Sequence, residues 1–464
     1  MRALLFALSL FGPPIPRPPQ PPEVSLALRD VTVIDVARGL ALSNMTVVIE
    51  GDHIARVGTS DTIRLPAGAR VVDAAGKFLI PGLWDMHVHT IFGDWFPGGR
   101  EIALPLFIAN GVTGVRDLGG DLEVLLQWRK EIAQGIIPGP RLVVSGEMLD
   151  GPAPRFPSSI AVSNPDDGRS AVRDLQRRGA DFIKLQSLIP REAVFAIADE
   201  ARILGIPVAG HVPDAVRAAE TSNAGQKSFE HLIGIFEGSS PLEDEFLEGG
   251  KGPGRFLQSF DAARAAKLIA LLAKNETWQC PTLVWERGGS LMEERDLDHD
   301  PLAKYAPAAW KAVTWKRFTD EIVQGYDVDL ATRKRFVEKE LELVGAMHRA
   351  GVPFLAGTDT AAGVYVFPGF SLHEELELFA KAGFTPREAL QTATLNPARF
   401  LGEEDRLGTV ESGKLADLAL LDRNPLDDIR NTREIFAVVA NGRFFSREDL
   451  DRLLLQVEER AASK

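Results

Sequence analysis

The apolar run Leu79-Ile80-Pro81-Gly82-Leu83 leads directly into Trp84-Asp85-Met86-His87-Val88-His89, and this stretch decides the fold. Side chains two positions apart on a β-strand point to the same face, so His87 and His89 can bind one divalent ion together. A pair of surface histidines is the ordinary explanation of such a motif taken alone. The motif therefore needs support from the rest of the chain.

More polar residues stand at the ends of short apolar runs further along the chain. His211 follows residues 206–210, His231 follows 228–230 and Asp359 follows 354–358. A core histidine with satisfied hydrogen bonds explains any one position, but packing does not explain why four of the eight histidines end such runs. Parallel barrel strands deliver their carboxyl ends to one mouth, so we expect one shared metal site there.

Lys184 lies on the apolar run 182–185, where an unpaired ammonium group would be costly. One explanation is an internal salt bridge to Asp117 or Glu147. The other is that the amine reacts with carbon dioxide to form a carbamate, an anion that can bridge two metal ions. The sequence does not choose between them.

Eight short apolar runs of strand type, mostly separated by helical patterns, occupy the middle of the chain. The runs are 78–83, 112–115, 142–144, 182–185, 208–212, 227–231, 279–284 and 354–356. The alternation predicts an α/β chain with a (β/α)8 TIM-like barrel over residues 81–401. A mostly helical insertion at about 286–347 is a candidate lid or specificity cap at the barrel mouth.

The two ends of the chain have a different pattern. Alternating runs and turn residues over 23–80 and 402–446 predict antiparallel strands, which we assign to one small β-sandwich domain built from both ends. Residues 447–464 predict a C-terminal helix. Residues 1–22, with a basic start, an apolar run and a proline-rich stretch, predict a signal peptide and export. A cytoplasmic protein with a proline-rich tail is the alternative.

The composition narrows the function classes. The formal net charge of -13 argues against nucleic acid and anionic membranes as partners, because both need basic patches. No segment is long and apolar enough to predict a transmembrane helix. The single cysteine, Cys280, excludes an intramolecular disulfide and a cysteine-rich zinc cage. We expect a small-molecule or dipeptide substrate, and the sequence leaves a homo-oligomer open.

The chain resembles the amidohydrolase superfamily of metal-dependent hydrolases over nearly its whole length after the N-terminal tail. Three stretches carry the resemblance: Pro81-Gly82-Leu83-Trp84-Asp85-Met86-His87-Val88-His89, Gly111-Val112-Thr113-Gly114-Val115-Arg116-Asp117 and Glu411-Ser412-Gly413-Lys414-Leu415-Ala416-Asp417-Leu418. The chain is most similar to the imidazolonepropionase-related, Xaa-Pro dipeptidase-like branch. By this resemblance, His87, His89 and Asp359 would hold one divalent ion, and His211 and His231 a second, more exposed one.

The resemblance also implies roles for Lys184 and Asp359. Lys184, as N6-carboxylysine, would bridge the two ions, and Asp359 would be the general base. The implied reaction is cleavage of an amide bond, in a dipeptide or an N-acyl amino acid, by a metal-bridging hydroxide. Zinc suits a site of histidine and carboxylate ligands, although iron, cobalt or manganese could replace it, and the ligand set alone does not choose among them. A mononuclear deaminase or a cyclic amide or lactone hydrolase is the alternative, and a non-catalytic relative would show missing ligands, whereas none is missing here.

Three further residues are weaker candidates for substrate contact. Arg155, in the loop 147–164, could pair with a substrate carboxylate, although a lone loop arginine is usually solvated. Tyr365 follows Asp359 in a glycine-containing loop, where a packed aromatic ring is the ordinary explanation. His373 stands at a helix start after the last strand, and a residue on a helix face is its ordinary explanation.

Overall fold

The computed structural model describes residues 25–91, 98–156, 159–296, 299–316, 320 and 328–463. The expected signal peptide, residues 1–22, lies outside the described residues and stays a prediction. Within the described part, every helix is too short or too polar to cross a membrane.

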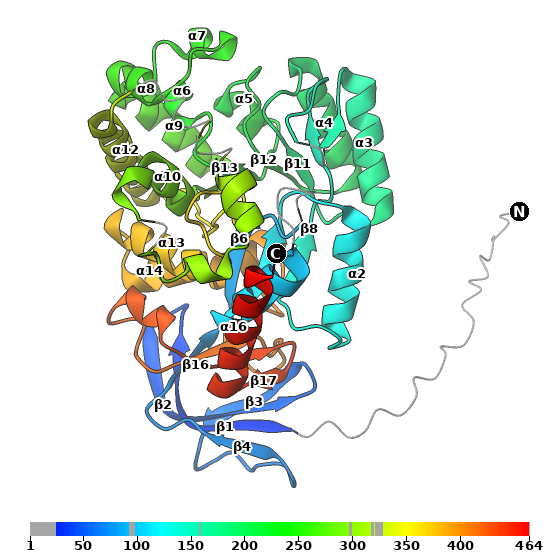
Figure 1. Ribbon diagram of the computed structural model, residues 1–464, viewed down its shortest axis with the longest axis vertical. Coiled ribbons are helices and arrows are strands. Elements are labelled where there is room, and N and C mark those ends of the chain that lie inside the picture. Colours follow the sequence, from blue (N-terminus) through cyan, green and yellow to red (C-terminus); the bar gives the residue numbers. More distant parts are fainter. Residues whose placement is uncertain are drawn as a thin grey trace, which may run out of the picture.

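Strands from both ends of the chain form one eight-stranded sheet, which lies at one end of the molecule (Figure 1). Its order is β17-β16-β15-β5-β1-β2-β3, with β4 beside β1. The bounds are β1 (Leu26–Asp35), β2 (Leu40–Glu50), β3 (His53–Thr59), β4 (Arg70–Asp73), β5 (Phe78–Pro81), β15 (Leu418–Leu421), β16 (Ile435–Ala440) and β17 (Arg443–Phe445). The two ends meet where β5 pairs antiparallel with β15, which sets Leu418 opposite Pro81. Alternate side chains of these strands build a separate hydrophobic core.

The middle of the chain forms parallel strands in two sheets, with orders β6-β7-β8 and β10-β9-β11-β12-β13-β14. Their bounds are β6 (Leu83–Val88), β7 (Val112–Asp117), β8 (Arg141–Val144), β9 (Met148–Asp150), β10 (Ser159–Ala161), β11 (Ile183–Leu185), β12 (Val208–Gly210), β13 (Ser228–Glu230) and β14 (Trp278–Cys280). The Asp181 backbone N–H donates to the Val144 carbonyl and links the two sheets. Parallel bridges join Phe354 to Gln279 and Thr360 to Val88, so the strand order returns to β6. The architecture is a TIM-barrel-like α/β fold.

Three expected strands differ from the structure. The run 78–83 is divided, because β5 ends at Pro81 in the terminal sheet and β6 begins at Leu83 among the parallel strands. Gly82 lies at the division, where an added Cβ would come within 1.9 Å of Thr113 Oγ1. The run 279–284 stops early because a helix begins at Leu283, and the run 354–356 forms a single bridge at Phe354.

Helices follow most parallel strands and surround them (Figure 1). Their bounds are η1 (Gly99–Ala103), α1 (Leu104–Ala109), α2 (Leu122–Ala133), α3 (Pro165–Arg178), α4 (Arg191–Leu204), α5 (Ala218–Asn223), α9 (Ala262–Lys274), α13 (Phe370–Lys381), α14 (Pro386–Thr392), α15 (Leu395–Leu401), η6 (Ile429–Arg433) and α16 (Arg447–Ala462). The side chains of Asp121, Asn164 and Asp261 cap α2, α3 and α9 by accepting backbone N–H groups. Each such cap stabilises its helix by about 1 kcal/mol.

Two irregular segments add short helices beside the parallel strands. Residues 234–260 contain α6 (Ile235–Gly238), α7 (Glu243–Glu248) and α8 (Pro253–Ser259), and the predicted insertion contains α10 (Leu283–Ser290), η2 (Met292–Glu294), η4 (Ala303–Tyr305), η5 (Trp310–Trp315) and α12 (Leu330–Arg349). The long helix α12 packs against α8, α10 and α13. Trp310 and Trp315 are buried and anchor the insertion.

Candidate metal centre

The six predicted ligands lie at the carboxyl ends of the parallel strands. His87 is on β6 and His89 comes directly after it, and Lys184 is on β11. His211 and His231 follow β12 and β13 by one residue each. Asp359 comes from the segment between the bridges at Phe354 and Thr360. The parallel strand order therefore aims residues far apart in sequence at one place.

Asp359 lies between the histidines. Its Oδ1 atom is 3.4 Å from His87 Nε2 and 3.2 Å from His89 Nε2, and its Oδ2 atom is 3.9 Å from His231 Nε2. The ring centre of His231 is 4.6 Å from that of His87 and 5.0 Å from that of His211. The structure thus brings the four histidines and the aspartate into one group.

Each of the four histidines has its Nδ1 atom fixed by an outer partner. The partners are Glu230 Oε2 at 2.9 Å from His87, Gly119 O at 3.3 Å from His89, Ser187 Oγ at 2.9 Å from His211 and Thr282 Oγ1 at 2.6 Å from His231. Carboxylate and carbonyl oxygens only accept, so His87 and His89 donate from Nδ1 and keep Nε2 as the coordinating atom. Such outer hydrogen bonds fix the tautomer and ring orientation of metal-binding histidines.

Three buried polar atoms of this group have no hydrogen-bond partner within the described ranges: His87 Nε2, Lys184 Nζ and Asp359 Oδ1. Buried polar atoms are nearly always satisfied in native proteins, because an unmade hydrogen bond leaves the desolvation cost uncompensated. Ligand atoms of His87, His89 and Asp359 also lie within 4.8 Å of one another. A divalent cation bound here would satisfy the imidazole and the carboxylate, so the residues fit a metal.

Burial keeps His87, His211 and His231 in the protonation state that binds metals. It lowers the pKa of His87 and His211 well below the usual value, and the pKa of His231 to about 4. Neutral imidazole coordinates a metal, whereas imidazolium does not. Burial alone would raise the pKa of Asp359, but its contacts with His87 and His89 outweigh this effect, and the net shift is downward. Asp359 is therefore ionised.

Lys184 is buried on β11, and neither salt bridge considered from the sequence forms. Asp117 accepts hydrogen bonds from the backbone N–H and the hydroxyl of Thr90, and Glu147 accepts from Arg178 at 2.8 Å. Burial lowers the pKa of Lys184 to about 8, because desolvation penalises the ammonium form. Within the described ranges, the amine therefore lies beside the candidate ligands with no paired carboxylate to explain its burial.

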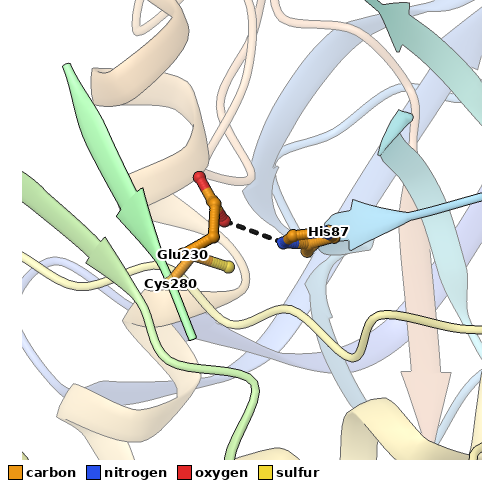
Figure 2. Close-up of side chains that lie close together, drawn as sticks. All are labelled: His87, Glu230 and Cys280. Carbon is orange, nitrogen blue, oxygen red and sulfur yellow. Dashed lines mark hydrogen bonds and ion pairs between the residues drawn. The ribbon is translucent and has the colours of Figure 1, made fainter. Parts of the chain in front are cut away.

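A second group of potential ligands, His87, Glu230 and Cys280, lies next to the first (Figure 2). Figure 2 shows the Glu230 carboxylate turned toward His87, with the Cys280 sulfur close to both. Glu230 is fully hydrogen-bonded, because Oε2 accepts from His87 and Oε1 accepts from Ser228 and Arg116. Burial raises the pKa of the Cys280 thiol well above its usual value, which disfavours the metal-binding thiolate. We interpret this group as the support of His87.

The ion pair between Arg116 and Glu230 has both side chains fully buried. Removing one partner of a buried pair leaves an uncompensated charge and costs about 3–5 kcal/mol. We expect Arg116→Met to lower the free energy of unfolding by that amount in urea denaturation. The matched control is Arg177→Ala, at an exposed pair with Asp174, which should cost less than about 1 kcal/mol. Equal effects of the two substitutions would contradict the structural role of Arg116.

Three buried charged residues at the centre are not found from the sequence as parts of the site: Arg116, Glu230 and Asp85. Asp85 accepts from the backbone N–H of Thr358 at 3.0 Å and from its hydroxyl at 2.7 Å. These bonds tie β6 to the segment that carries Asp359. The available signal is a charged residue inside an apolar strand run, which is the same signal that singles out Lys184.

The backbone is unusual at two of the ligands. His231 has φ of 60° and Asp359 has φ of 58°, in the left-handed region that L-residues with side chains seldom adopt. Such a conformation costs on the order of 1–3 kcal/mol and persists where the surrounding structure enforces it, often at functional sites. Both residues belong to the group of candidate ligands.

A cavity of about 460 Å³ opens over the ligands. Its floor includes His89, Lys184, His211, His231 and Asp359, and its walls include Asp150, Arg155 and Phe156 from the loop 147–164 and Trp285, Glu286, Phe336 and Glu340 from α10 and α12. The insertion and the loop therefore shape the space in front of the ligands. Another cavity, of about 440 Å³ beside Trp84 and Phe400, is lined by none of the six ligands.

Of the three weaker candidates, only Arg155 lines the cavity. The Tyr365 hydroxyl donates to the Arg295 carbonyl at 3.0 Å, and the Arg295 guanidinium covers its ring, so Tyr365 is a packed aromatic. His373 is buried between Thr432 Oγ1 and the Asn110 carbonyl, at 2.9 Å and 3.1 Å from its ring nitrogens. Tertiary partners outside the cavity hold both side chains, so the structure does not bring Tyr365 or His373 to the candidate centre, and their contact with substrate stays a prediction.

The sequence model of the amidohydrolase family matches residues 78–444. The chain belongs to the amidohydrolase family. It is a hydrolase that acts on carbon–nitrogen bonds, as the resemblance predicted. This family typically binds divalent metals, in agreement with the unpaired ligand atoms at the centre.

Known relatives cover most of the chain. Ochratoxinase of Aspergillus niger is 26% identical over 471 residues, which cover 86% of this chain and 82% of the relative. Imidazolonepropionase of Rhizorhabdus wittichii is 32% identical over 376 residues, which cover 77% of this chain and 82% of the relative. The crystal structure of a Xaa-Pro dipeptidase with bound methionine has a TM-score of 0.67 at 22% identity, covering 91% of this chain and all of that one. The last similarity supports the fold alone.

Proposed function

We propose that this amidohydrolase cleaves an amide bond of a small substrate, such as a dipeptide or an N-acyl amino acid, with two divalent metal ions. The observation that carries the proposal is the convergence of four histidines and Asp359 beside the buried amine of Lys184. The cavity in front of this group has room for a substrate of that size.

The two proposed ions divide the histidines. His87 and His89, with Asp359, would hold the ion nearer the core, since His87 is fully buried. His211 and His231 would hold the ion nearer the cavity. Two divalent ions lower the pKa of a shared water and polarise the carbonyl of the amide. Zinc suits a centre of histidine and carboxylate ligands.

Lys184 supplies the proposed bridge. In this reaction the Nζ lone pair of the neutral amine attacks the carbon of carbon dioxide. An Nζ–C bond forms, one C–O π bond breaks with its electron pair moving to oxygen, and one Nζ proton passes to water, which leaves a carbamate with two oxygen ligands. The burial of Lys184 favours the neutral amine that this reaction needs. An ammonium group at the same position would repel both metal ions, so the carbamate also removes an electrostatic conflict.

Asp359 has a separate role in proton transfer. Its Oδ1 atom faces the His87 and His89 pair, so Oδ2, on the His231 side, remains available for a proton. We assign to this oxygen the removal of a proton from the attacking water and its delivery to the leaving amine. The ionised state of Asp359 in the free enzyme fits the first of these steps.

The organisation of the chain supports this site. We propose that residues 81–401 form one closed barrel of eight strands and that 23–80 and 402–446 form a separate β-domain. The bridges at Phe354 and Thr360 and the bond from Asp181 to Val144 support closure. A crystal structure in which residues 354–360 pair with neither neighbouring strand would contradict it.

Metal removal tests the proposal directly. We expect prolonged dialysis against EDTA to abolish hydrolysis of a panel of dipeptides and N-acyl amino acids, and zinc to restore it in proportion up to about two equivalents. Inductively coupled plasma mass spectrometry measures the metal, and a ninhydrin assay measures the released amine. Full activity at one equivalent, with deamination or opening of a cyclic amide or lactone, would support the mononuclear alternative. Full activity without metal would overturn both.

A further inference from the structure

One buried carboxyl group in the cavity has an oxygen that lacks a hydrogen-bond partner in the part of the chain that the structure describes. Glu340, on α12, is only 4% exposed, yet it lines the same cavity as His231 and Asp359. Its Oε2 atom accepts no hydrogen bond from the described residues, and none of their cationic groups forms an ion pair with it. A carboxyl group in such a place normally has a partner, because its burial is otherwise costly.

Two other carboxyl groups lie near Glu340, and their negative charge adds to the cost of burying it without a cationic partner. Glu286, on α10, lines the cavity with it, and Glu375, on α13, accepts the backbone N–H groups of Leu283 and Val284 at 3.0 Å and 2.8 Å. Burial, with Glu286 and Glu375 nearby, raises the pKa of Glu340 well above its usual value. A positive charge beside Glu340 would relieve this repulsion.

The positively charged groups that line the cavity lie elsewhere. Lys184 is on the floor among the metal ligands, and Arg155 comes from the loop 147–164, where its guanidinium covers the Phe156 ring. Other acids of the cavity have partners. Glu237 accepts from the Gly234 backbone N–H and lies 3.5 Å from Lys251, Asp214 pairs with Lys251 at 2.6 Å, and Asp150 accepts the backbone N–H groups of Arg155 and Leu188. Among the described residues, Glu340 Oε2 is thus a buried carboxyl oxygen of this wall with neither a hydrogen bond nor an ion pair.

Aromatic rings form the surface around the carboxyl groups. Phe336 lies one helical turn before Glu340 on α12, and its ring centre is 4.7 Å from that of Phe236 and 6.2 Å from that of Phe256. Trp285 lies next to Glu286 on α10 and lines the cavity with these rings. Aromatic faces attract organic cations and cover their alkyl chains, so the wall combines charge with apolar contact.

We propose that Glu340 and Glu286 bind a cationic group of the substrate, an ammonium or guanidinium, whose alkyl or aryl stem packs on Phe336 and Trp285. This inference rests on the proposed amide hydrolysis and names its substrate class: amides that carry a positive charge a few atoms from the scissile bond. The strongly negative net charge of the chain is consistent with attraction of such substrates.

Matched substrates test the charge preference. With zinc-loaded enzyme, we compare kcat/KM for glycyl-lysine with that for glycyl-norleucine, and kcat/KM for lysyl-glycine with that for norleucyl-glycine. The side-chain ammonium group of lysine is the relevant difference within each pair. A hydrogen bond between charged partners corresponds to roughly a 10- to 100-fold preference for the lysine member. Glu340→Gln should reduce this ratio to near unity, and Glu286→Gln should reduce it in part. The control Glu237→Gln, at the satisfied acid of the same cavity, should keep the ratio.

Direct binding separates this inference from the proposed function. Phenethylammonium, an arylalkyl cation with no amide, is titrated calorimetrically into the wild type and each variant after circular dichroism has confirmed the fold. Tighter binding to the wild type than to Glu340→Gln supports the cation site even if no peptide is cleaved. Equal binding, or a lysine-to-norleucine ratio that Glu340→Gln leaves unchanged, overturns it. Cleavage of both peptides at equal rates would overturn the inference while the proposed amide hydrolysis stands.

Discussion

Lys184→Ala is expected to lose about one of two metal equivalents and to lower kcat/KM by about a thousandfold. A metal that polarises a carbonyl contributes several kcal/mol of transition-state stabilisation, and about 4 kcal/mol corresponds to a thousandfold in rate. Without the bridge, His211 and His231 alone would have to hold the outer ion, and two neutral imidazoles bind a divalent ion weakly compared with the four ligands that zinc prefers. Mass spectrometry of the metal content and initial rates on the dipeptide panel measure both effects.

The chain offers a matched control and a rescue for Lys184. Lys227 is partly buried just before β13, where its ammonium donates to the Phe400 carbonyl outside the centre, so Lys227→Ala should keep both metal equivalents. Lys184→Glu places a carboxylate at the bridging position and should recover part of the second equivalent. If Lys184→Ala binds two equivalents and hydrolyses the panel at the wild-type rate, the carbamate bridge does not exist.

The grouping of the candidate ligands was predictable because each lies in or directly after an apolar run. Polar residues lie on or directly after buried strands at His211, His231 and Lys184. The (β/α)8 pattern predicts that such positions face the same mouth of the barrel. Glu230 is also a polar residue in an apolar run, directly before His231. Its role depends on a contact with β6, which no local sequence pattern predicts. His373 differs from these residues, because its partner Thr432 lies in η6, far along the chain, and holds it away from the cavity.

The cavity wall was less predictable than its floor. In sequence, Glu340 belongs to a helix in which acidic and basic residues alternate, and such a residue normally faces solvent. It is buried because α12 packs against α8, α10 and α13, an arrangement set by tertiary contacts of the insertion. The division of the run 78–83 between two sheets has the same origin, because β5 pairs with β1 and β15 whereas β6 pairs with β7, and all these partners are remote in sequence.

Asp359→Asn is expected to lower kcat by about 10²- to 10⁴-fold, the usual contribution of a positioned general base. The substitution keeps the shape of the side chain and one oxygen that can face His87 and His89, but it removes the oxygen that accepts the proton. Because Asp359 also serves as a proposed ligand, the variant is measured with zinc in excess and its bound metal is determined in parallel. KM should change far less than kcat, since the cavity walls that bind substrate are untouched.

The control for Asp359→Asn is Asp214→Asn. Asp214 lines the same cavity, but its carboxylate pairs with Lys251 at 2.6 Å and is partly exposed, so it has no role in the proposed proton transfer. Its variant should keep kcat near the wild-type value. A variant of Asp359 that retains both metal equivalents and loses less than about tenfold in kcat would mean that another group accepts the proton. If the variant loses bound metal together with activity, the experiment assigns Asp359 to metal binding alone. The loss of activity would then follow from the loss of the inner ion held by Oδ1, and it would give no evidence that Oδ2 accepts a proton.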